Sequence, residues 1–187
     1  MLTIIFLFLI TKSSSEKHMP INQDNKNWYA LYTHSRCEFK VEEALKAEGI
    51  SVYLPVTKTV KKWSDRKKEI TSPLFACYVF INATEKERLT SLQHEQVVRC
   101  LTDAGKPAIV PNWQIESLKR MISVNHDYNV MGGLIKGDEI EIKSGLFKGV
   151  RGVIIEIENK NHLAISIELL NRTVIVHLAD EVVRAAH

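Results

Sequence analysis

The stretch KGDEIEIKSGLFKGVRGVIIEI, Lys136–Ile157, has alternating apolar residues on both sides of a centre that contains Gly145, Gly149 and Gly152. Glycines beside lysines are typical of phosphate-binding loops, but those loops need a helix directly after the glycines. Here the run Val153–Ile157 is rich in β-branched residues and predicts a strand instead. We therefore interpret the stretch as a β-hairpin, in which the glycines allow a positive φ, a tight bend and a close approach between strands.

The residues around this hairpin predict more short strands and no helix. The expected strands are 139–143, 150–158, 163–169 and 173–178, with turn residues between them. About 50 residues of short strands favour a small β-barrel. We expect this domain to cover residues 136–187, after a linker at 125–135 that contains Gly132 and Gly133.

The residues before the linker alternate between strand and helix patterns. Strands are expected at 28–33, 51–60, 74–81, 97–101 and 107–111, and helices at 36–48, 84–93 and 112–124. A charged connection, 61–68, interrupts the apolar pattern. The order β-α-β-β-α-β with a final helix predicts an α+β domain of the ferredoxin-like type over residues 27–124, in which helices cover one face of an antiparallel sheet.

Composition restricts the class of protein. The chain has 187 residues and a net charge of +3, which allows one domain or two small ones and does not by itself indicate nucleic acid. Cys37, Cys77 and Cys100 lack metal-ligand spacing, which indicates reduced thiols in a cytoplasmic protein with no metal or cofactor. The apolar run Leu2–Ile10 is too short to span a membrane and lacks signal-peptide flanks. Residues 1–26 are expected to be a disordered leader or an incorrectly assigned start, with a cryptic signal and an anchor as alternatives.

Motifs in both halves resemble one family. The glycine hairpin resembles the KOW motif of small SH3-like barrels, while WYALYT at 28–33 and PLFACYVF at 73–80 resemble the N-terminal domain of the NusG transcription factors. The motifs occur in the family's order, and the resemblance covers Asn27 to about Arg184. The segment AGKPAIVP, 104–111, resembles the specialised RfaH and UpxY-type paralogues.

The resemblance implies a monomeric, non-enzymatic factor with no small-molecule substrate. It would bind RNA polymerase and act in transcription elongation and antitermination, suppressing pausing or termination on particular long operons such as capsular polysaccharide loci. A housekeeping NusG-type elongation factor and a ribosome-associated KOW protein that binds RNA are the alternatives. The β-branched residues of the C-terminal part favour strands over the helical hairpin that some relatives form.

The resemblance also implies contact surfaces for the polymerase. The positions that match the clamp contact are Tyr32, Pro55, Phe75, Tyr78 and Phe80. Because side chains alternate along a strand, we expect Tyr78 and Phe80 on the polymerase face and Phe75 in the core; burial of all the aromatics in the core is the alternative. A gate-loop contact, placed at the start of the second helix, would use Thr90 and Ser91.

Two further surfaces follow from the same resemblance. Contact with non-template DNA or nascent RNA would use His34, Arg36, Lys40, Lys61, Lys62, Trp63, Arg66, Lys67 and Lys68, although a charge run of this kind is also typical of a solvated hairpin. The barrel would dock a small-subunit ribosomal protein or Rho through Phe147, Leu169, Leu170 and Arg172. Leu170 stands where the family often has an aromatic residue, so the partner stays open.

Overall fold

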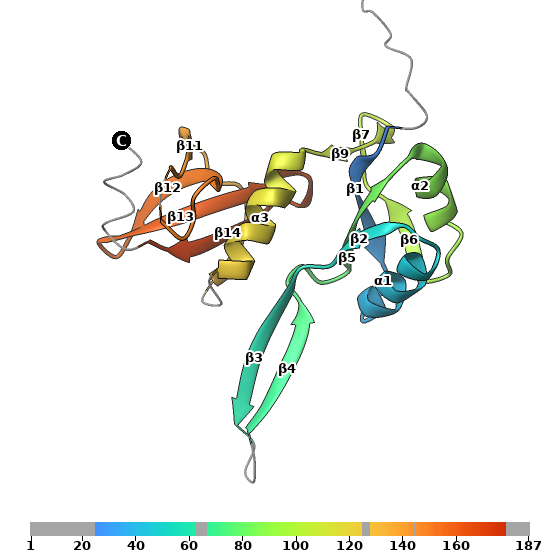
Figure 1. Cartoon of the computed structure of the whole chain (residues 1–187), viewed down its shortest axis with the longest axis horizontal. Coiled ribbons are helices and arrows are strands. Elements are labelled where there is room, and N and C mark those ends of the chain that lie inside the picture. The colour runs from blue at the N-terminus through green and yellow to red at the C-terminus, as the bar shows by residue number, and fades with distance from the viewer. Residues whose placement is uncertain (1–24, 63–66, 125–127, 144, 179–187) are drawn as a thin grey trace, which may run out of the picture.

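Two antiparallel sheets, one from each half of the chain, form the body of the computed structural model (Figure 1). The structure describes residues 25–62, 67–124, 128–143 and 145–178. The N-terminal elements are β1 (Asn27–Thr33), α1 (Glu38–Ala47), β2 (Ser51–Tyr53), β3 (Val56–Lys62), β4 (Lys67–Pro73), β5 (Tyr78–Ala83), α2 (Glu85–Ser91), β6 (Val97–Cys100), β7 (Thr102–Asp103), β8 (Lys106–Pro107), β9 (Ile109–Val110) and α3 (Asn112–Val124).

The N-terminal sheet has the strand order β2-β5-β1-β6, with β9 also paired to β1. Every pairing is antiparallel; Tyr29, for example, stands opposite Ile81. On one face, Val41 and Leu45 of α1 are fully buried in one apolar cluster with Ile81 and its neighbours. Helices α1 and α2 therefore cover this face, and α3 lies on the other side of the sheet (Figure 1).

The start of α2 shows why the sequence signal for this helix was reliable. Thr84 Oγ1 accepts a hydrogen bond from the Glu87 backbone N–H at 3.3 Å, and Glu87 Oε2 accepts one from the Thr84 N–H at 2.7 Å. This reciprocal pair is a capping box, which satisfies two donors at the helix start. The helix expected at 84–93 is confirmed, with Thr84 as its N-cap.

A two-stranded arm replaces the expected charged connection. Leu54 and Pro55 follow β2, and β3 then pairs with β4 from Val56 opposite Pro73 to Lys62 opposite Lys67. No other described strand pairs with the arm, and Figure 1 shows it projecting from the N-terminal sheet. The expectation of one extended strand over 51–60 was wrong, because Pro55 divides it and the second part leaves the sheet.

The strand expected at 74–81 begins only at Tyr78. Cys77 has a φ of 66°, in the left-handed region, so the chain turns before the strand. Phe75 therefore does not follow the strand alternation, and its ring meets that of Phe80 at 6.1 Å. The prediction that Phe75 and Phe80 lie on opposite faces was wrong for this reason.

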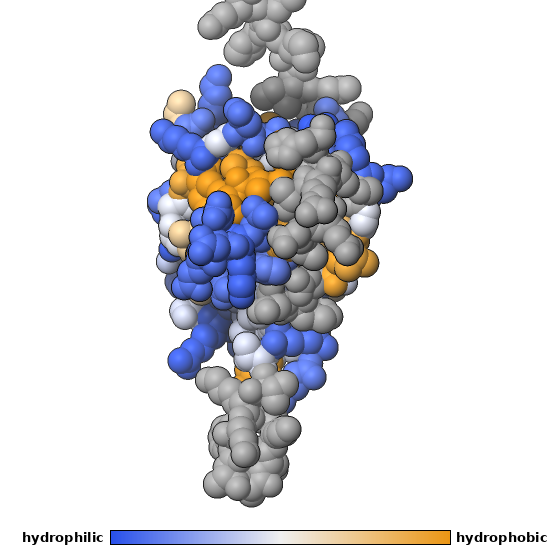
Figure 2. All heavy atoms as spheres, turned by 90° about the vertical axis from the view of Figure 1, so that its left-hand side faces the viewer, coloured by the Kyte–Doolittle hydropathy of each residue, from blue (hydrophilic) through white to orange (hydrophobic). Residues whose placement is uncertain are grey.

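The C-terminal elements are β10 (Tyr128–Gly132), β11 (Glu139–Glu141), β12 (Arg151–Ile157), β13 (Lys160–Ile167), the short 3-10 helix η1 (Glu168–Leu170) and β14 (Arg172–His177). They form a five-stranded antiparallel sheet in the order β10-β14-β13-β12-β11. Part of the expected linker is thus a strand, β10. An apolar area is visible on the end of the molecule that this sheet forms, with hydrophilic side chains above it, below it and on its left (Figure 2).

The glycines of the opening stretch have the expected conformations. Gly145 and Gly149 have φ values of 74° and 80°. A Cβ at Gly152 would lie 2.5 Å from the Ala164 carbonyl oxygen, so β12 and β13 approach closely there. The interpretation of this stretch as a strand-turn-strand unit is confirmed, with β11 before the turn and β12, which contains Gly152, after it. Among the described residues, no helix is long and apolar enough to cross a membrane.

Candidate functional site

The face of the N-terminal sheet opposite α1 and α2 carries a cluster of aromatic side chains. Tyr53 stacks on Phe80 with ring centres 6.3 Å apart, and Trp28 meets Tyr53 edge-on at 6.4 Å. Phe75 completes the cluster from the turn before β5. Such rings bury large apolar areas and often form the centre of interfaces. We call Trp28, Tyr53, Phe75 and Phe80 the aromatic face.

Helix α3 contacts the aromatic face from one side. The indole Nε1 of Trp28 donates a hydrogen bond to Oδ1 of Asn112, the first residue of α3, at 3.1 Å. The Nζ of Lys119 lies 4.6 Å from the centre of the Trp28 ring and 5.4 Å from that of Tyr53, which is cation–π geometry. Burial is the main cause that raises the pKa of the Tyr53 hydroxyl above its ordinary value.

The same helix packs on the C-terminal sheet. Ile115, Leu118 and Met121 have no exposed surface and belong to one apolar cluster with Phe147 and Val150 of the glycine stretch. Since the aromatic face belongs to this cluster as well, α3 forms a continuous apolar core with both sheets.

Polar contacts fix the position of α3 on the glycine stretch. Arg120 donates a hydrogen bond through Nη1 to the Lys148 carbonyl oxygen. Ser117 Oγ accepts a hydrogen bond from the Arg151 backbone N–H at 3.0 Å. A Cβ at Gly149 would lie 2.3 Å from Arg120 Nη1, so only glycine leaves room for this side chain where it lies.

The structure divides the predicted clamp residues into two groups. Phe80 is fully buried, Phe75 is 3% exposed and Pro55 is buried. Tyr32 and Tyr78 are half-buried, and their rings meet edge-on at 5.4 Å. The expectation of Phe80 as a surface anchor was wrong because the ring packs inside the aromatic face, whereas Phe75 lies in the core as predicted.

The predicted gate-loop residues lie in the last turn of α2 rather than at the start of the second helix. Ser91 is fully buried, and its hydroxyl donates to the Glu87 carbonyl oxygen at 2.8 Å. Thr90 is half-buried and donates to the Lys86 carbonyl oxygen at 3.1 Å. Only Thr90 of the two therefore retains surface that a partner could contact.

The predicted nucleic-acid residues come from two separate places. His34, Arg36 and Lys40 are exposed around the start of α1. Lys61 and Lys62 belong to β3, and Lys67 and Lys68 belong to β4. Trp63 and Arg66 fall outside the described residues, as do the side chains of Lys61, Lys62, Lys67 and Lys68.

The predicted docking residues of the C-terminal part are close to η1 and to the glycine stretch. Phe147 and Leu170 are buried, at 5% and 6% exposed. Leu169 is half-buried, and Arg172 is exposed. Phe147 packs in the cluster that contains α3, so it is not free for a second partner while the helix is in place.

Sequence reasoning predicted α3 but not its contacts. The stripe Ile115, Leu118 and Met121 indicated one apolar face, while the contacts of Lys119 and Arg120 come from residues that a pattern assigns to solvent. Gln114 and Ser117 are also buried, at 1% and 3% exposed, so the packed surface of α3 is wider than the apolar stripe. Polar residues of this kind give no sign of burial in a hydropathy pattern.

Residues 26–119, half of the 187-residue chain, match the NusG family, described as "Transcription termination factor nusG". No curated protein sequence matches the chain. Among solved structures, "Domain interaction in Thermotoga maritima NusG" is similar, with 24% identity over 84% of this chain and 96% of that chain and a TM-score of 0.45. "Crystal Structure of MjSpt4:Spt5 complex conformation A" is similar at 18% identity over 83% and 94%, with a TM-score of 0.27. On the match over residues 26–119, the chain belongs to the NusG family of transcription factors.

Proposed function

We propose that this protein is an elongation and antitermination factor that binds RNA polymerase and suppresses pausing or termination. We further propose that it acts in the cytoplasm on particular long operons, such as capsular polysaccharide loci. Family membership supports the general class. The observation that carries the polymerase contact is the half-buried pair Tyr32 and Tyr78 beside the aromatic face.

The geometry of this pair suits an interface anchor. Arg99 lies over the Tyr32 ring, with its guanidinium carbon 5.6 Å from the ring centre. Tyr78 packs against the apolar cluster that contains Phe80. Tyrosine and arginine supported by a rigid apolar base are enriched among the residues that dominate binding energy. In this proposal Pro55, Phe75 and Phe80 shape the surface from beneath, and the tyrosines contact the polymerase clamp.

Thr90 would supply a second contact, to the gate loop of the polymerase. A factor that binds clamp and gate loop together has higher affinity for the closed clamp than for the open one. It therefore shifts the population toward the closed, elongating state. This difference in affinity would suppress pausing and termination without any chemical step.

The C-terminal sheet is proposed to be a KOW-type SH3-like barrel, and the N-terminal sheet a ferredoxin-like domain. The antiparallel order β2-β5-β1-β6 with two helices on one face supports the second assignment. Leu169 and Arg172 retain exposed surface and would begin contact with a ribosomal protein or Rho. His34, Arg36, Lys40 and the β3–β4 arm would contact non-template DNA or nascent RNA.

Purified RNA polymerase tests the central claim. Changing Tyr32→Ala and Tyr78→Ala together should weaken binding by more than about thirtyfold, since each anchor is expected to contribute about 2 kcal/mol. Phe39→Ala is the matched control, because Phe39 is 42% exposed on α1, the helix on the opposite face of the sheet. Equal polymerase binding by the folded double variant and by the control variant would refute the clamp contact.

Transcript profiles test operon specificity. Deleting the gene should reduce the promoter-distal transcripts of a few long operons and leave other units unchanged. A change across the whole transcriptome would point to the housekeeping alternative instead. The role of the arm has a separate test: neutralising Lys61, Lys62, Lys67 and Lys68 should reduce the salt dependence of nucleic-acid binding, and an unchanged slope would make the arm a solvated hairpin.

A further inference from the structure

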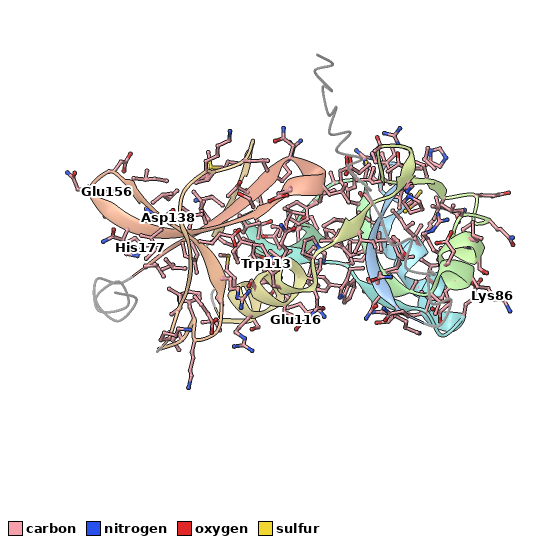
Figure 3. The ribbon with its side chains drawn as sticks, turned by 90° about the horizontal axis from the view of Figure 1, so that it is seen from above. Lys86, Trp113, Glu116, Asp138, Glu156 and His177 are labelled. Carbon is pink, nitrogen blue, oxygen red and sulfur yellow. The ribbon has the colours of Figure 1, made fainter. Side chains whose placement is uncertain are left out.

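Two pockets meet at the turn η1 and open beside the start of α3. A pocket of about 290 Å³ is lined by Trp113, Glu139 and Glu168, among others. A second pocket, of about 660 Å³, is lined by Ile109, Gln114 and Leu169, among others, and Glu168 lines it as well. The two pockets share Glu168, and Trp113 of the first precedes Gln114 of the second on α3; we call the two pockets together the η1 groove. Figure 3 shows Trp113 on α3 where the helix passes beside the C-terminal sheet.

Gln114 is the unusual residue of the η1 groove. Its side chain is 1% exposed, and Oε1 has no hydrogen-bond partner among the described residues. Buried polar atoms are nearly always bonded, because an unpaired one loses its water contacts without replacement. The backbone N–H of Gln114 is already used, as it donates to Pro111 at 3.0 Å. Gln114 lines the wider pocket, so this unpaired acceptor lies at the wall of the η1 groove.

The charges at the other end of the groove favour a cation. Glu139 and Glu168 are exposed, and neither forms an ion pair with another described residue. Of the described residues that line this pocket, Lys136 alone is cationic, beside the two carboxylates. An indole ring flanked by carboxylates attracts a guanidinium or ammonium group, through the ring face and through charge-assisted hydrogen bonds.

The wider pocket gives the η1 groove an apolar end, at which the charged residues compensate one another. Ile109 is 55% exposed, a high value for an isoleucine beside a cavity, and Leu169 is half-buried. The charged residues at this end, Asp103 and Lys106, stand opposite each other in the β7–β8 pairing and offset one another. An apolar side chain can therefore occupy this end without meeting an uncompensated charge.

We propose that the η1 groove binds an extended, basic peptide segment of a partner protein. An apolar side chain would lie against Ile109 and Leu169, a backbone N–H would donate to Gln114 Oε1, and a Lys or Arg side chain would enter beside Trp113, Glu139 and Glu168. Residues i and i+2 of an extended chain point the same way about 6.6 Å apart, so the recognised pattern is an apolar residue two positions from a basic one.

The chemistry favours peptide over nucleic acid. Phosphate groups would be repelled by the two carboxylates beside Trp113, whereas a peptide supplies donor, cation and apolar groups together. The groove also needs both halves of the chain, since Ile109 and Gln114 come from one and Glu168 and Leu169 from the other. Peptide binding would thus stabilise the contact of α3 with the C-terminal sheet. The inference goes beyond the proposed polymerase contact and does not depend on it.

Selection from a displayed random heptapeptide library on the full chain tests the proposal. Enriched peptides should carry Lys or Arg two positions from Leu, Ile, Met or Phe. A synthetic copy of the most enriched peptide should change tryptophan fluorescence on binding. Trp113→Ala and Glu168→Lys should each weaken its binding at least about tenfold. The matched control is Glu156→Lys, an equal charge reversal at an exposed site that Figure 3 places at the far end of the C-terminal sheet, and its affinity should stay within about twofold.

Gln114→Leu separates recognition from folding. The leucine keeps the apolar bulk and removes the unpaired acceptor, so the variant should melt at a higher temperature and yet bind the peptide about fivefold more weakly. A library that yields no peptide, enriched peptides without basic residues, or binding that Trp113→Ala and Glu168→Lys leave intact would each overturn the proposal. A variant with Tyr32→Ala and Tyr78→Ala should bind the peptide normally, so failure here is distinct from failure of the polymerase contact.

Discussion

The ammonium group of Lys119 lies 4.6 Å from the centre of the Trp28 ring, and this contact joins α3 to the N-terminal sheet. Lys119 also pairs with Glu116 at 2.8 Å, but an ion pair on a helix surface adds little stability. The cation–π contact contributes about 0.5–1 kcal/mol. Lys119→Met should lower the free energy of unfolding by about that amount, and Lys119→Arg should retain most of it, as measured by urea denaturation.

Lys86→Met is the control for this prediction. Lys86 is exposed on α2 and forms no ion pair with another described residue, so its change should stay within about 0.5 kcal/mol. If Lys86→Met and Lys119→Met destabilised the protein equally, the ring contact would have no energetic role.

Cys77→Gly should stabilise the protein. A side chain at a φ of 66° costs about 1–2 kcal/mol, and glycine removes that cost. Part of the gain is offset because glycine has more freedom in the unfolded chain, so the expected net increase is about 0.5–1 kcal/mol. Cys77→Ala keeps the Cβ and should give no increase. Thermal unfolding of both variants measures these changes in stability. If Cys77→Ala were stabilised as well, the increase would come from loss of the thiol and not from relief of backbone strain.

Glu38 holds the same turn from α1. Its Oε1 accepts a hydrogen bond from the Cys77 backbone N–H at 2.6 Å, and the side chain is 4% exposed. Glu38→Ala removes the acceptor of that half-buried N–H, which should cost about 1 kcal/mol or more. Glu38→Gln retains a carbonyl acceptor and should cost less. Glu43→Ala, an exposed change on the same helix, is the reference, and an equal loss there would show only a helix-wide effect.

Local signals in the sequence were sufficient for several elements. Helix α3 is indicated by Asn112 at its start and by the apolar stripe Ile115, Leu118 and Met121. The start of α2 is indicated by Thr84 and Glu87, which form the capping box. Each of these signals acts within a few residues, through a helix cap or one apolar face. The strand-glycine-strand pattern was predictable for the same reason, since the β-branched residues after Gly152 exclude a helix.

The candidate site was less predictable because it depends on contacts between distant residues. Hydropathy gave no sign that Cys77 has a positive φ, so the alternation of 74–81 placed Phe75 and Phe80 on opposite faces. Phe80 has the same apolar signature whether it packs on a helix or contacts a partner. Its burial follows from Tyr53 and Phe75, which come from other parts of the chain.

The stability of the protein should depend on Glu87 in a pH-sensitive way. The backbone hydrogen bond from Thr84, and then the contact with Lys26, lower the pKa of this carboxyl below its usual 4.5. A group with a lower pKa in the folded state stabilises the fold above its unfolded pKa, and this contribution disappears as the pH falls through the folded value. The melting-temperature difference between wild type and Glu87→Gln should therefore be larger at pH 7 than at about pH 3.

Glu95→Gln, at an exposed carboxylate outside α2, provides the comparison for Glu87. Its melting-temperature difference from wild type should be small and nearly independent of pH. A Glu87→Gln difference that stays constant from neutral to acidic pH would mean that the capping contact does not depend on charge.

Gly152 and Gly149 should differ in how alanine affects them. A Cβ at Gly152 would lie 2.5 Å from the Ala164 backbone oxygen, which cannot move without separating β12 from β13. Gly152→Ala should therefore cost more than about 2 kcal/mol, as overpacking against a rigid neighbour does. A Cβ at Gly149 would meet the mobile end of Arg120, so Gly149→Ala should cost about 1–2 kcal/mol from its φ of 80°, plus the lost bond to Lys148.

A double-mutant cycle separates these costs. In an Arg120→Ala background the bond from Arg120 to the Lys148 carbonyl is already absent, so Gly149→Ala should cost only the backbone strain. The cost of Gly152→Ala should be the same in both backgrounds, because Ala164 and not Arg120 is the obstacle. If Gly149→Ala lowered the free energy of unfolding equally with and without Arg120, the glycine would be needed only for the backbone conformation of the turn. It would then make no contribution to the contact between α3 and the C-terminal sheet.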